Sequence, residues 1–375
     1  MKVIIIGAGI AGLSIGWRLA QAGAEAVVLE RAQPGRAATW ASAGMLAATL
    51  ETGHAPASEV AFARKAMTLW PGFAQELEEA SGHRLNYRRD GALVVALSEA
   101  EADVLKARAA GAGVGFLSRD DARAKVPGLA ADIFGALWAP DEAQVDNRAL
   151  GSALATALLR AGGSLQANEA VVRIEDLPAG RIAVRTAFRT HEADAVVLAA
   201  GAWSGQIEGL PPEAVPPVHP VKGEMIALYP PAAAVLPKPI VWGNQIYLVP
   251  RGSRLFVGAT GSDSGFDTTL TAEAEHWLFT QACGLMPELT NWEVAEHWAG
   301  LRPGSPDGLP ILGASGMENV YIASGQFRNG ILLAPAIAEV MQSLVLERRL
   351  PPEIAAFDPR RFQNDTSLAT EGPVQ

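Results

Sequence analysis

The first residues able to do chemistry are the glycines of the segment Gly7-Ala8-Gly9-Ile10-Ala11-Gly12, which have the spacing G-x-G-x-x-G. In a turn between a strand and a helix, the first glycine permits the bend and the second lets a pyrophosphate approach the backbone. The third lets the helix pack against the strand. The phosphate then lies at the helix N-terminus, where free N–H groups and the dipole favour negative charge. The spacing therefore predicts a dinucleotide site.

A carboxylate follows where such a site needs one. Glu30 ends the next apolar run, 18 residues after Gly12. A carboxylate there binds ribose hydroxyls and repels a 2′-phosphate, so NADP is disfavoured while FAD and NAD both remain open. The competing interpretation is a purely structural glycine turn with Glu30 in solvent.

Other chemistries find little support. The single cysteine, Cys283, excludes an internal disulfide and a thiolate zinc cluster, and it favours a reducing compartment. The six histidines, His54 among them, lack metal-binding spacing, so we expect no metal site. Ser14 formally completes a G-x-S-x-G motif, but it falls inside the first helix, where it cannot act as a nucleophile elbow.

The elements that position the glycine turn form a strand-helix-strand unit. Lys2 to Ile6 is an apolar run typical of a parallel strand buried on both faces, Ile10 to Ala22 has helical period, and Ala26 to Leu29 is a second strand. Two later runs also stop near glycine, namely Ala195 to Leu198 and Val320 to Ala323. Their spacing predicts one sheet assembled from distant segments. A helix over Ile331 to Leu346 would close it.

The middle of the chain has a different character. Leu85 to Ala96 and Ile240 to Ala259 alternate polar with apolar residues, which predicts half-exposed antiparallel strands. The proline-rich segment Pro211 to Pro239 is interpreted as a crossing between domains. The polar tail after Pro351 is expected to end loosely.

Composition limits the class of protein. The chain has 375 residues, 49% of them apolar and 19% charged, which indicates a folded, soluble protein of two or three domains. Its net charge of −10 disfavours nucleic acid and anionic membranes as partners. Pro335 and Glu339 interrupt the longest apolar segment, so we expect no membrane anchor and a cytoplasmic protein.

Four motifs carry a resemblance to a known family. They are Ala41-Ser42-Ala43-Gly44-Met45-Leu46, Pro220-Val221-Lys222-Gly223-Glu224, Trp298-Ala299-Gly300-Leu301-Arg302-Pro303 and Phe327-Arg328-Asn329-Gly330-Ile331-Leu332-Leu333-Ala334-Pro335. Together they resemble the glycine-oxidising branch of the D-amino acid oxidase family of flavoenzymes, from Lys2 to about Leu350. Gly35 to Leu46 has small residues and no helix or strand period, and it would let backbone pass close to a flavin. Its competing interpretation is a plain loop.

The resemblance implies non-covalent FAD, because Cys283 lies outside the segments assigned to the flavin. It implies ribose contacts from Glu30 and Arg31, pyrophosphate contacts from Ala38 and Thr39, and a backbone contact to adenine from Val171. The remaining implied cofactor residues are Gly7, Gly9, Ile10, Ala11, Gly12, Ala43, Gly44, Met45, Gly201, Gln326, Phe327, Arg328, Asn329, Gly330, Ile331 and Leu332.

The resemblance also assigns substrate residues. Arg302 is similar to the family's carboxylate clamp, since a guanidinium offers a planar pair of donors. Tyr247 matches its second carboxylate donor, and Arg328 is expected near both substrate and flavin. The competing interpretations are a surface arginine and a core tyrosine. Gln245 departs from the histidine of the best-matching relatives, which puts any imidazole role in amine recognition in doubt.

The implied fold is α/β, with a Rossmann-like FAD-binding domain (1–84, 142–217 and 300–350), a second, mostly antiparallel substrate domain (85–141 and 218–299), and a tail (351–375). The implied activity is FAD-dependent oxidation of glycine, sarcosine or small D-amino acids by hydride transfer to flavin N5, with O₂ reduced to H₂O₂. A link to the thiazole of thiamine and a homo-oligomer are further expectations. The alternatives are a D-amino acid dehydrogenase with a quinone or dye acceptor, and a non-catalytic dinucleotide-binding subunit.

Overall fold

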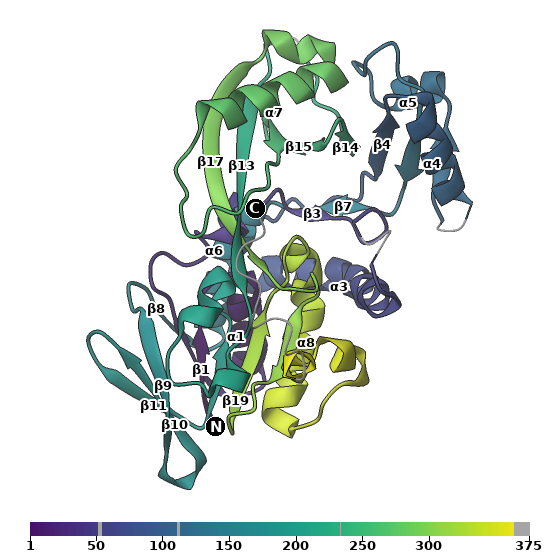
Figure 1. The fold of residues 1–375 in the computed structure, drawn as a ribbon. Helices are drawn as coiled ribbons and strands as arrows, with labels where there is room; N and C mark the ends of the chain where they lie inside the picture. Colours follow the sequence, from purple (N-terminus) through teal and green to yellow (C-terminus); the bar gives the residue numbers. More distant parts are fainter. Residues whose placement is uncertain (52–54, 111–112, 233, 364–375) are drawn as a thin grey trace.

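Two large sheets dominate the fold. The structure, a computed structural model, describes residues 1–51, 55–110, 113–232 and 234–363. One sheet has six strands and the other has eight. The first lies in the lower half of Figure 1 and the second in its upper half, and the long strands β13 and β17 run between them. The expected α/β fold with a second, mostly antiparallel sheet is confirmed.

The six-stranded sheet has the order β18-β19-β12-β1-β2-β8. Parallel pairing joins β1 (Lys2–Ile6) to β2 (Glu25–Leu29) and β12 (Ala195–Leu198), and β12 to β19 (Val320–Ser324). The edges are β8 (Ser164–Gln166) and the antiparallel β18 (Ile311–Ala314). Segments far apart in sequence therefore build one sheet, as their apolar runs predicted.

Three helices cover one face of this sheet: α1 (Ile10–Gln21), α6 (Asn147–Arg160) and α8 (Gly330–Glu347). A fourth helix, α3 (Ala57–Ser81), packs on α6 and α8. Alternate β1 side chains face them, while the others face a second cluster beside the small sheet, so both faces are buried. By length and composition alone α8 could cross a membrane, but most of it is buried in this layer, which makes it weak evidence for an anchor.

The eight-stranded sheet has the order β17-β13-β16-β15-β14-β4-β6-β5. Its neighbours are antiparallel except β14 and β4. Its strands are β4 (Ala92–Ala96), β5 (Gly115–Leu117), β6 (Gly135–Ala139), β13 (His219–Tyr229), β14 (Ile240–Gly243), β15 (Ile246–Arg251), β16 (Arg254–Gly258) and β17 (Glu293–Gly304). Three helices contact its strands: α4 (Glu99–Ala109), α5 (Arg119–Lys125) and α7 (Ala272–Leu285).

The prediction that these strands are half-exposed was wrong. Leu248 packs in a cluster with α7, while its neighbour Val249 packs in a cluster with Ala41 and Ala43, so both faces of β15 are covered and five of its six residues are buried. In this part of the sheet α7 covers one face, and the segment from Trp40 to Leu50 covers the other. Of the predicted segment Leu85 to Ala96, only β4 is a strand.

The segment Pro211 to Pro239 does cross between the two large sheets, but the sequence did not predict that a strand makes this crossing. It contains β13, which pairs with both β16 and β17 and reaches both sheets. Its prolines fall before the strand, at its second residue (Pro220) and after it, so they leave most of its ladder donors intact. The prolines lie near the two ends of the strand, and their number hid the apolar pattern of the residues in its middle.

The tail after Pro351 does not end loosely over its described part. Two 3₁₀ helices, η5 (Pro352–Phe357) and η6 (Pro359–Phe362), pack on the core, with Ile354 and Phe357 fully buried and Phe357 5.3 Å from the Phe62 ring centroid. These two apolar side chains dock an otherwise polar segment. Residues 364–375 lie outside the described residues.

The predicted domain boundaries stay a prediction, and β17 runs across the one between residues 299 and 300. The smaller elements are α2 (Ala38–Ala41), β3 (Met45–Leu46), β7 (Ala143–Gln144), β9 (Val171–Leu177), β10 (Arg181–Thr186), β11 (Thr190–Ala193), η1 (Pro178–Gly180), η2 (Gly201–Gln206), η3 (Pro212–Ala214) and η4 (Pro287–Asn291). β9, β10 and β11 form the small sheet that projects at the lower left of Figure 1.

Candidate active site

The glycine turn lies between β1 and α1, and each glycine has its own reason. Gly7 has φ +105°, and a Cβ there would strike the carbonyl oxygen of Ala199. A Cβ on Gly12 would strike the carbonyl oxygen of Gly7, so the helix could not approach the strand. A Cβ on Gly9 would meet only Thr39 Oγ1, at 3.7 Å, which leaves the backbone open to a ligand. This turn fits a pyrophosphate.

The predicted adenosine-side residues gather at the carboxyl ends of the parallel strands. Glu30 follows β2 and accepts hydrogen bonds from the backbone N–H of Ala8 (2.8 Å) and of Ala32 (3.0 Å). The guanidinium of Arg31 lies 4.1 Å from the centroid of the Trp203 ring. Gly201 begins η2 just after β12, and Val171 begins β9. These residues lie around the glycine turn and do not line the cavity described next.

Thr39 connects the glycine turn to the cavity. Its hydroxyl accepts a 2.9 Å hydrogen bond from the N–H of Ile10, and its carbonyl accepts one of 2.9 Å from the Asn147 amide. The segment Gly35 to Leu46, expected to lack regular structure, contains the one-turn helix α2 and the short strand β3. Hydrogen bonds from neighbouring elements stabilise these two short pieces, which have no sequence period of their own.

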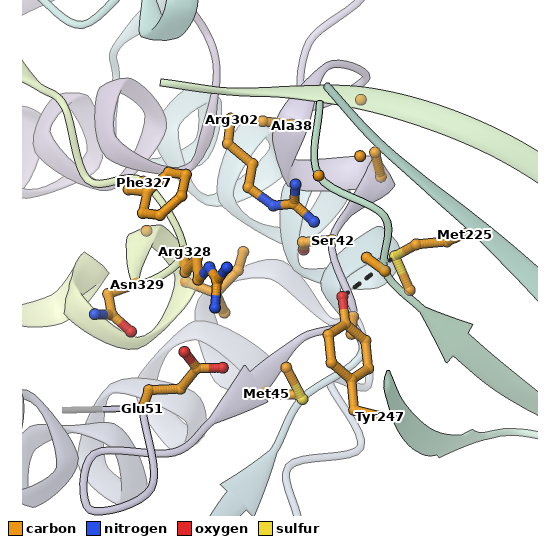
Figure 2. Close-up of a pocket in the computed structure, with 18 of the residues that line it drawn as sticks. Ala38, Ser42, Met45, Glu51, Met225, Tyr247, Arg302, Phe327, Arg328 and Asn329 are labelled. Carbon is orange, nitrogen blue, oxygen red and sulfur yellow. Dashed lines mark hydrogen bonds between the residues drawn. The ribbon is translucent and has the colours of Figure 1, made fainter. Parts of the chain in front are cut away.

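A cavity of about 250 Å³ lies between the two sheets (Figure 2). The residues predicted from sequence that line it are Ala38, Thr39, Ala43, Gly44, Met45, Gln245, Tyr247, Arg302, Gln326, Phe327, Arg328, Asn329, Gly330 and Ile331. Gly7, Gly9, Ile10, Ala11, Gly12 and Leu332 lie outside its lining. Ile10 nevertheless adjoins it, because a Cβ on Gly330 would sit 3.7 Å from the Ile10 side chain.

Arg302 reaches the cavity from β17. Its Nη1 donates to the carbonyl of Thr260 (3.1 Å) and lies 3.5 Å from that of Lys222. Its remaining N–H groups make no side-chain ion pair within the described residues, and Figure 2 shows the guanidinium facing the same space as Tyr247 and Arg328. The side chain can therefore offer two parallel donors to an incoming carboxylate.

Tyr247 reaches the same space from β15. Burial raises the pKa of its phenol, and the nearby positive charge of Arg302 opposes that rise. The hydroxyl also lies 3.7 Å from Met225 Sδ. A neutral phenol beside a guanidinium can donate to the oxygen pair that the guanidinium binds.

Sequence reasoning missed Glu51, which lines the cavity beside the two arginines. Figure 2 shows its carboxylate facing the Arg328 guanidinium. Burial raises the pKa of Glu51, although Arg328 and Arg302 both oppose this. One signal was available: Glu51 is the first charged residue after Arg36, at the end of a long neutral run. A charge that ends such a run must find a polar environment.

The turn from Gln326 to Ile331 closes the cavity against α1. Phe327 has φ +44°, and its N–H donates to the Pro303 carbonyl (3.0 Å), while the Asn329 amide donates to the buried Glu59 carboxylate (2.9 Å). α8 begins within this segment, at Gly330, so its positive end lies at the cavity. These bonds hold the predicted flavin-edge segment in one conformation.

Two further predicted features fall in different places. Gln245 lines the cavity from the two-residue turn Asn244-Gln245 between β14 and β15, where both residues have positive φ. Cys283 is half-buried on α7, away from the cavity lining. Among the described residues, which omit His54, no three potential metal ligands gather.

Comparison with known proteins identifies relatives over nearly the whole chain. The family described as DAO, FAD dependent oxidoreductase, matches residues 2–344. A bifunctional protein ThiO/ThiG of Synechocystis is 35% identical, over 97% of this chain and 54% of the relative, so the chain spans about half the length of these bifunctional relatives. The glycine oxidase of Pseudomonas aeruginosa is 33% identical, over 96% of this chain and 98% of its own.

A solved structure agrees with these relatives. The crystal structure of glycine oxidase from Geobacillus kaustophilus matches with a TM-score of 0.89 and 32% identity, covering 96% of this chain and 99% of the other. The match includes both large sheets, so it extends to the cavity between them. The chain belongs to the DAO family of FAD-dependent oxidoreductases, as the resemblance predicted.

Proposed function

We propose that this protein catalyses the FAD-dependent oxidation of glycine and other small amino acids, including sarcosine and small D-amino acids, with O₂ reduced to H₂O₂. The observation that carries the proposal is the meeting of Arg302 and Tyr247 in one cavity, next to the turn at the start of α8. Relatives named glycine oxidase, similar over nearly their whole length, support the same substrate class.

The residues present fit FAD. The open backbone at Gly9 and the N-terminus of α1 suit its diphosphate, and Glu30 suits its ribose. We assign its ring to the side of the cavity formed by Ala43 to Met45 and by Gln326 to Ile331, with Val171, Gly201 and Arg31 on the adenosine side. When bound, FAD supplies the acceptor of the two electrons removed from the substrate.

Substrate orientation falls to the chain's own side chains. Arg302 binds the substrate carboxylate through two N–H donors, and the Tyr247 phenol donates to the same oxygens. Fixing that end of the molecule fixes the direction of its Cα–H bond, and orientation of this kind contributes a large part of a barrier reduction. Arg328 projects from the flavin-edge turn into the same cavity, with Glu51 partly balancing its charge.

Water exclusion falls to apolar side chains. Met45, Met225 and Trp242 line the wall around Tyr247. A dry wall strengthens the charged hydrogen bonds of Arg302, because the local dielectric is low. It also delays hydrolysis of the imine until the product leaves.

The relatives named ThiO/ThiG support a further part of the proposal, in which the imine formed from glycine supplies the thiazole of thiamine. We also propose a cytoplasmic enzyme without a membrane anchor, based on one unpaired cysteine and an acidic composition. Assembly as a homo-oligomer is part of the same proposal.

The test starts with the purified protein, which should be yellow. Adding glycine without air should bleach the flavin absorbance, and admitting air should restore it with release of H₂O₂. Dye reduction without peroxide would indicate a dehydrogenase instead, and a flavin that no amino acid bleaches would indicate a non-catalytic subunit. A panel of glycine, sarcosine and small D- and L-amino acids scored by peroxide release ranks the substrates.

A further inference from the structure

The segment Lys222-Gly223-Glu224 lies on β13 behind Arg302. Successive residues of a strand point to opposite faces, so Lys222 and Glu224 share one face and Gly223 belongs to the other. Gly223 lines the cavity, whereas Lys222 and Glu224 are buried beside the segment that leads into α7. One tripeptide thus contributes to two sides of the sheet.

The guanidinium of Arg302 lies directly over the backbone of Gly223. A Cβ built on Gly223 would sit 2.5 Å from both Nη1 and Nη2 and 2.6 Å from Cζ of Arg302. Carbon and nitrogen in contact need more than 3 Å, so any side chain at this position would displace the guanidinium. The guanidinium is the tip of the flexible Arg302 side chain, so it can move without unfolding the sheet.

The other face fixes the carbonyl groups that Arg302 binds. The Lys222 ammonium and Glu224 carboxylate form a buried pair at 3.0 Å. Glu224 also accepts from the Thr271 N–H (3.0 Å), and the Lys222 ammonium donates to the Thr269 carbonyl. These contacts fasten both ends of the segment from Thr260 to Thr271 to β13, because the Thr260 hydroxyl accepts from the Glu224 N–H (2.8 Å).

The fastened segment presents the Thr260 carbonyl, which accepts from Arg302 at 3.1 Å. The Lys222 carbonyl lies 3.5 Å from the same nitrogen and accepts from the N–H of Ser262 at 3.1 Å. His297 Nε2, on the neighbouring β17, lies 2.9 Å from the other oxygen of Glu224 and adds to the packing around the pair. The position of Arg302 therefore depends on both faces of β13.

We propose that Lys222-Gly223-Glu224 is the positioning element for Arg302: Gly223 sets how deeply the guanidinium lies, and the Lys222–Glu224 pair holds the carbonyls that orient it. The proposal rests on the proposed function of Arg302 as the carboxylate-binding group. Neither Gly223 nor Glu224 touches the reacting atoms, so both are positioning residues. The sequence motif Lys-Gly-Glu thereby gains a physical reason.

The main test is Gly223→Ala, with Gly115→Ala as the matched control. Gly115 lies on β5 of the same sheet, outside the cavity, where a Cβ would meet no atom within 4 Å and φ is not positive. The methyl group added at position 223 should push the guanidinium away from its two carbonyls. We expect KM for glycine to rise at least about 10-fold with kcat at saturation changed less than about 3-fold.

A second readout needs no turnover. Acetate, a carboxylate without an amine, should perturb the flavin absorption of the holoenzyme, and its Kd should weaken in Gly223→Ala by about the same factor as KM. An unchanged KM and acetate Kd would overturn the proposal, as would an equal effect in Gly115→Ala. Loss of bound flavin in Gly223→Ala would also overturn it, because the glycine would then serve the fold and not Arg302.

The acetate titration also separates this inference from the proposed function. A wild-type protein that binds acetate but does not oxidise glycine contradicts the proposed function, while the Gly223→Ala shift in acetate Kd still tests the positioning of Arg302. The double variant Lys222→Met/Glu224→Gln removes both charges of the buried pair, so it leaves no unpaired charge. It should raise the acetate Kd with normal flavin content, and an unchanged Kd would remove the pair from the proposal.

Discussion

The candidate site has two parts, a glycine wall beside the cavity and an arginine wall that lines it, and they differ in what they offer a ligand. The glycine wall consists of Gly7 to Gly12 with Thr39, and it offers backbone N–H groups and empty space where side chains are missing. The arginine wall consists of Tyr247, Arg302, Arg328 and Glu51, and it offers charged and polar side chains from distant strands and turns. The first wall should therefore be sensitive to added volume, and the second to lost charge.

The largest effect should come from adding volume to the glycine wall. In Gly7→Ala the new residue must hold φ +105° and its Cβ must displace the Ala199 carbonyl, which is backbone and cannot move freely. We expect a loss of about 3–5 kcal/mol of stability. The variant should lack bound flavin after gel filtration and should show a clearly lower Tm.

Gly72→Ala is the control for that change. Gly72 lies in α3, where a Cβ meets nothing within 4 Å, so alanine should be neutral or slightly stabilising through its helix propensity. A Gly7→Ala protein that keeps its flavin and the wild-type Tm would contradict the volume argument for this wall.

The next effect should come from removing charge at the arginine wall. Arg302→Ala deletes a bidentate charged donor, and such hydrogen bonds contribute about 1.5–3 kcal/mol each. We expect KM for glycine to rise about 100-fold or more while flavin content stays normal. Steady-state peroxide release measures it, with the exposed Arg84→Ala as control. Unchanged kinetics would show that Arg302 does not bind the substrate. The arginine wall would then not act mainly through its charge.

The two walls also differ in how far sequence alone could predict them. The glycine wall is local: Gly7, Gly12 and Glu30 act within one strand-helix-strand unit, so their spacing carried the prediction. The arginine wall is assembled from β15, β17 and two turns, and spacing could not bring Tyr247 and Arg302 together. They were assigned through the resemblance, and their roles remain a proposal.

The features that the sequence did not predict have the same physical origin. Glu51 was overlooked because its partners, Arg302 and Arg328, are more than 250 residues away in sequence. β13 was overlooked because prolines at its ends outweighed the apolar residues in its middle. Ile354 and Phe357 dock a tail whose average composition is polar. In each case the structure is decided by a few contacts between residues far apart in sequence, and not by the average composition of the local segment.

A smaller effect should come from removing one hydroxyl at the arginine wall. Tyr247→Phe keeps the ring, which packs against the backbone of Gly258, and removes only the donor beside Arg302. A hydrogen bond to a charged group contributes at least about 1.5 kcal/mol, so KM should rise about 10-fold or more and kcat should change less. The partly exposed Tyr229→Phe serves as control. An effect as large as that of Arg302→Ala would mean that the phenol does more than bind the carboxylate.

The smallest effect should be a change in how stability depends on pH at the edge of the arginine wall. Glu142 accepts hydrogen bonds from the N–H groups of Thr49 (2.8 Å) and Leu50 (3.0 Å), and so holds the turn that leads to Glu51. Burial outweighs these bonds and raises the pKa of Glu142 to about 7. An unfolded glutamate titrates near 4.5. Between these two values the folded protein binds more protons than the unfolded chain, so this group's contribution to stability falls as pH rises from about 4.5 to about 7.

Glu142→Gln isolates that contribution, because glutamine keeps a carbonyl acceptor for the turn and does not titrate. The wild-type Tm should fall by a few degrees more than the variant's Tm between pH 5 and pH 8, since about 3 kcal/mol is small beside the unfolding entropy of a chain this long. Differential scanning at several pH values measures both slopes, with the exposed Asp141→Asn as control. Parallel slopes for variant and wild type would show that Glu142 stays ionised, and the pH sensitivity expected of the arginine wall would then have to come from Glu51 alone.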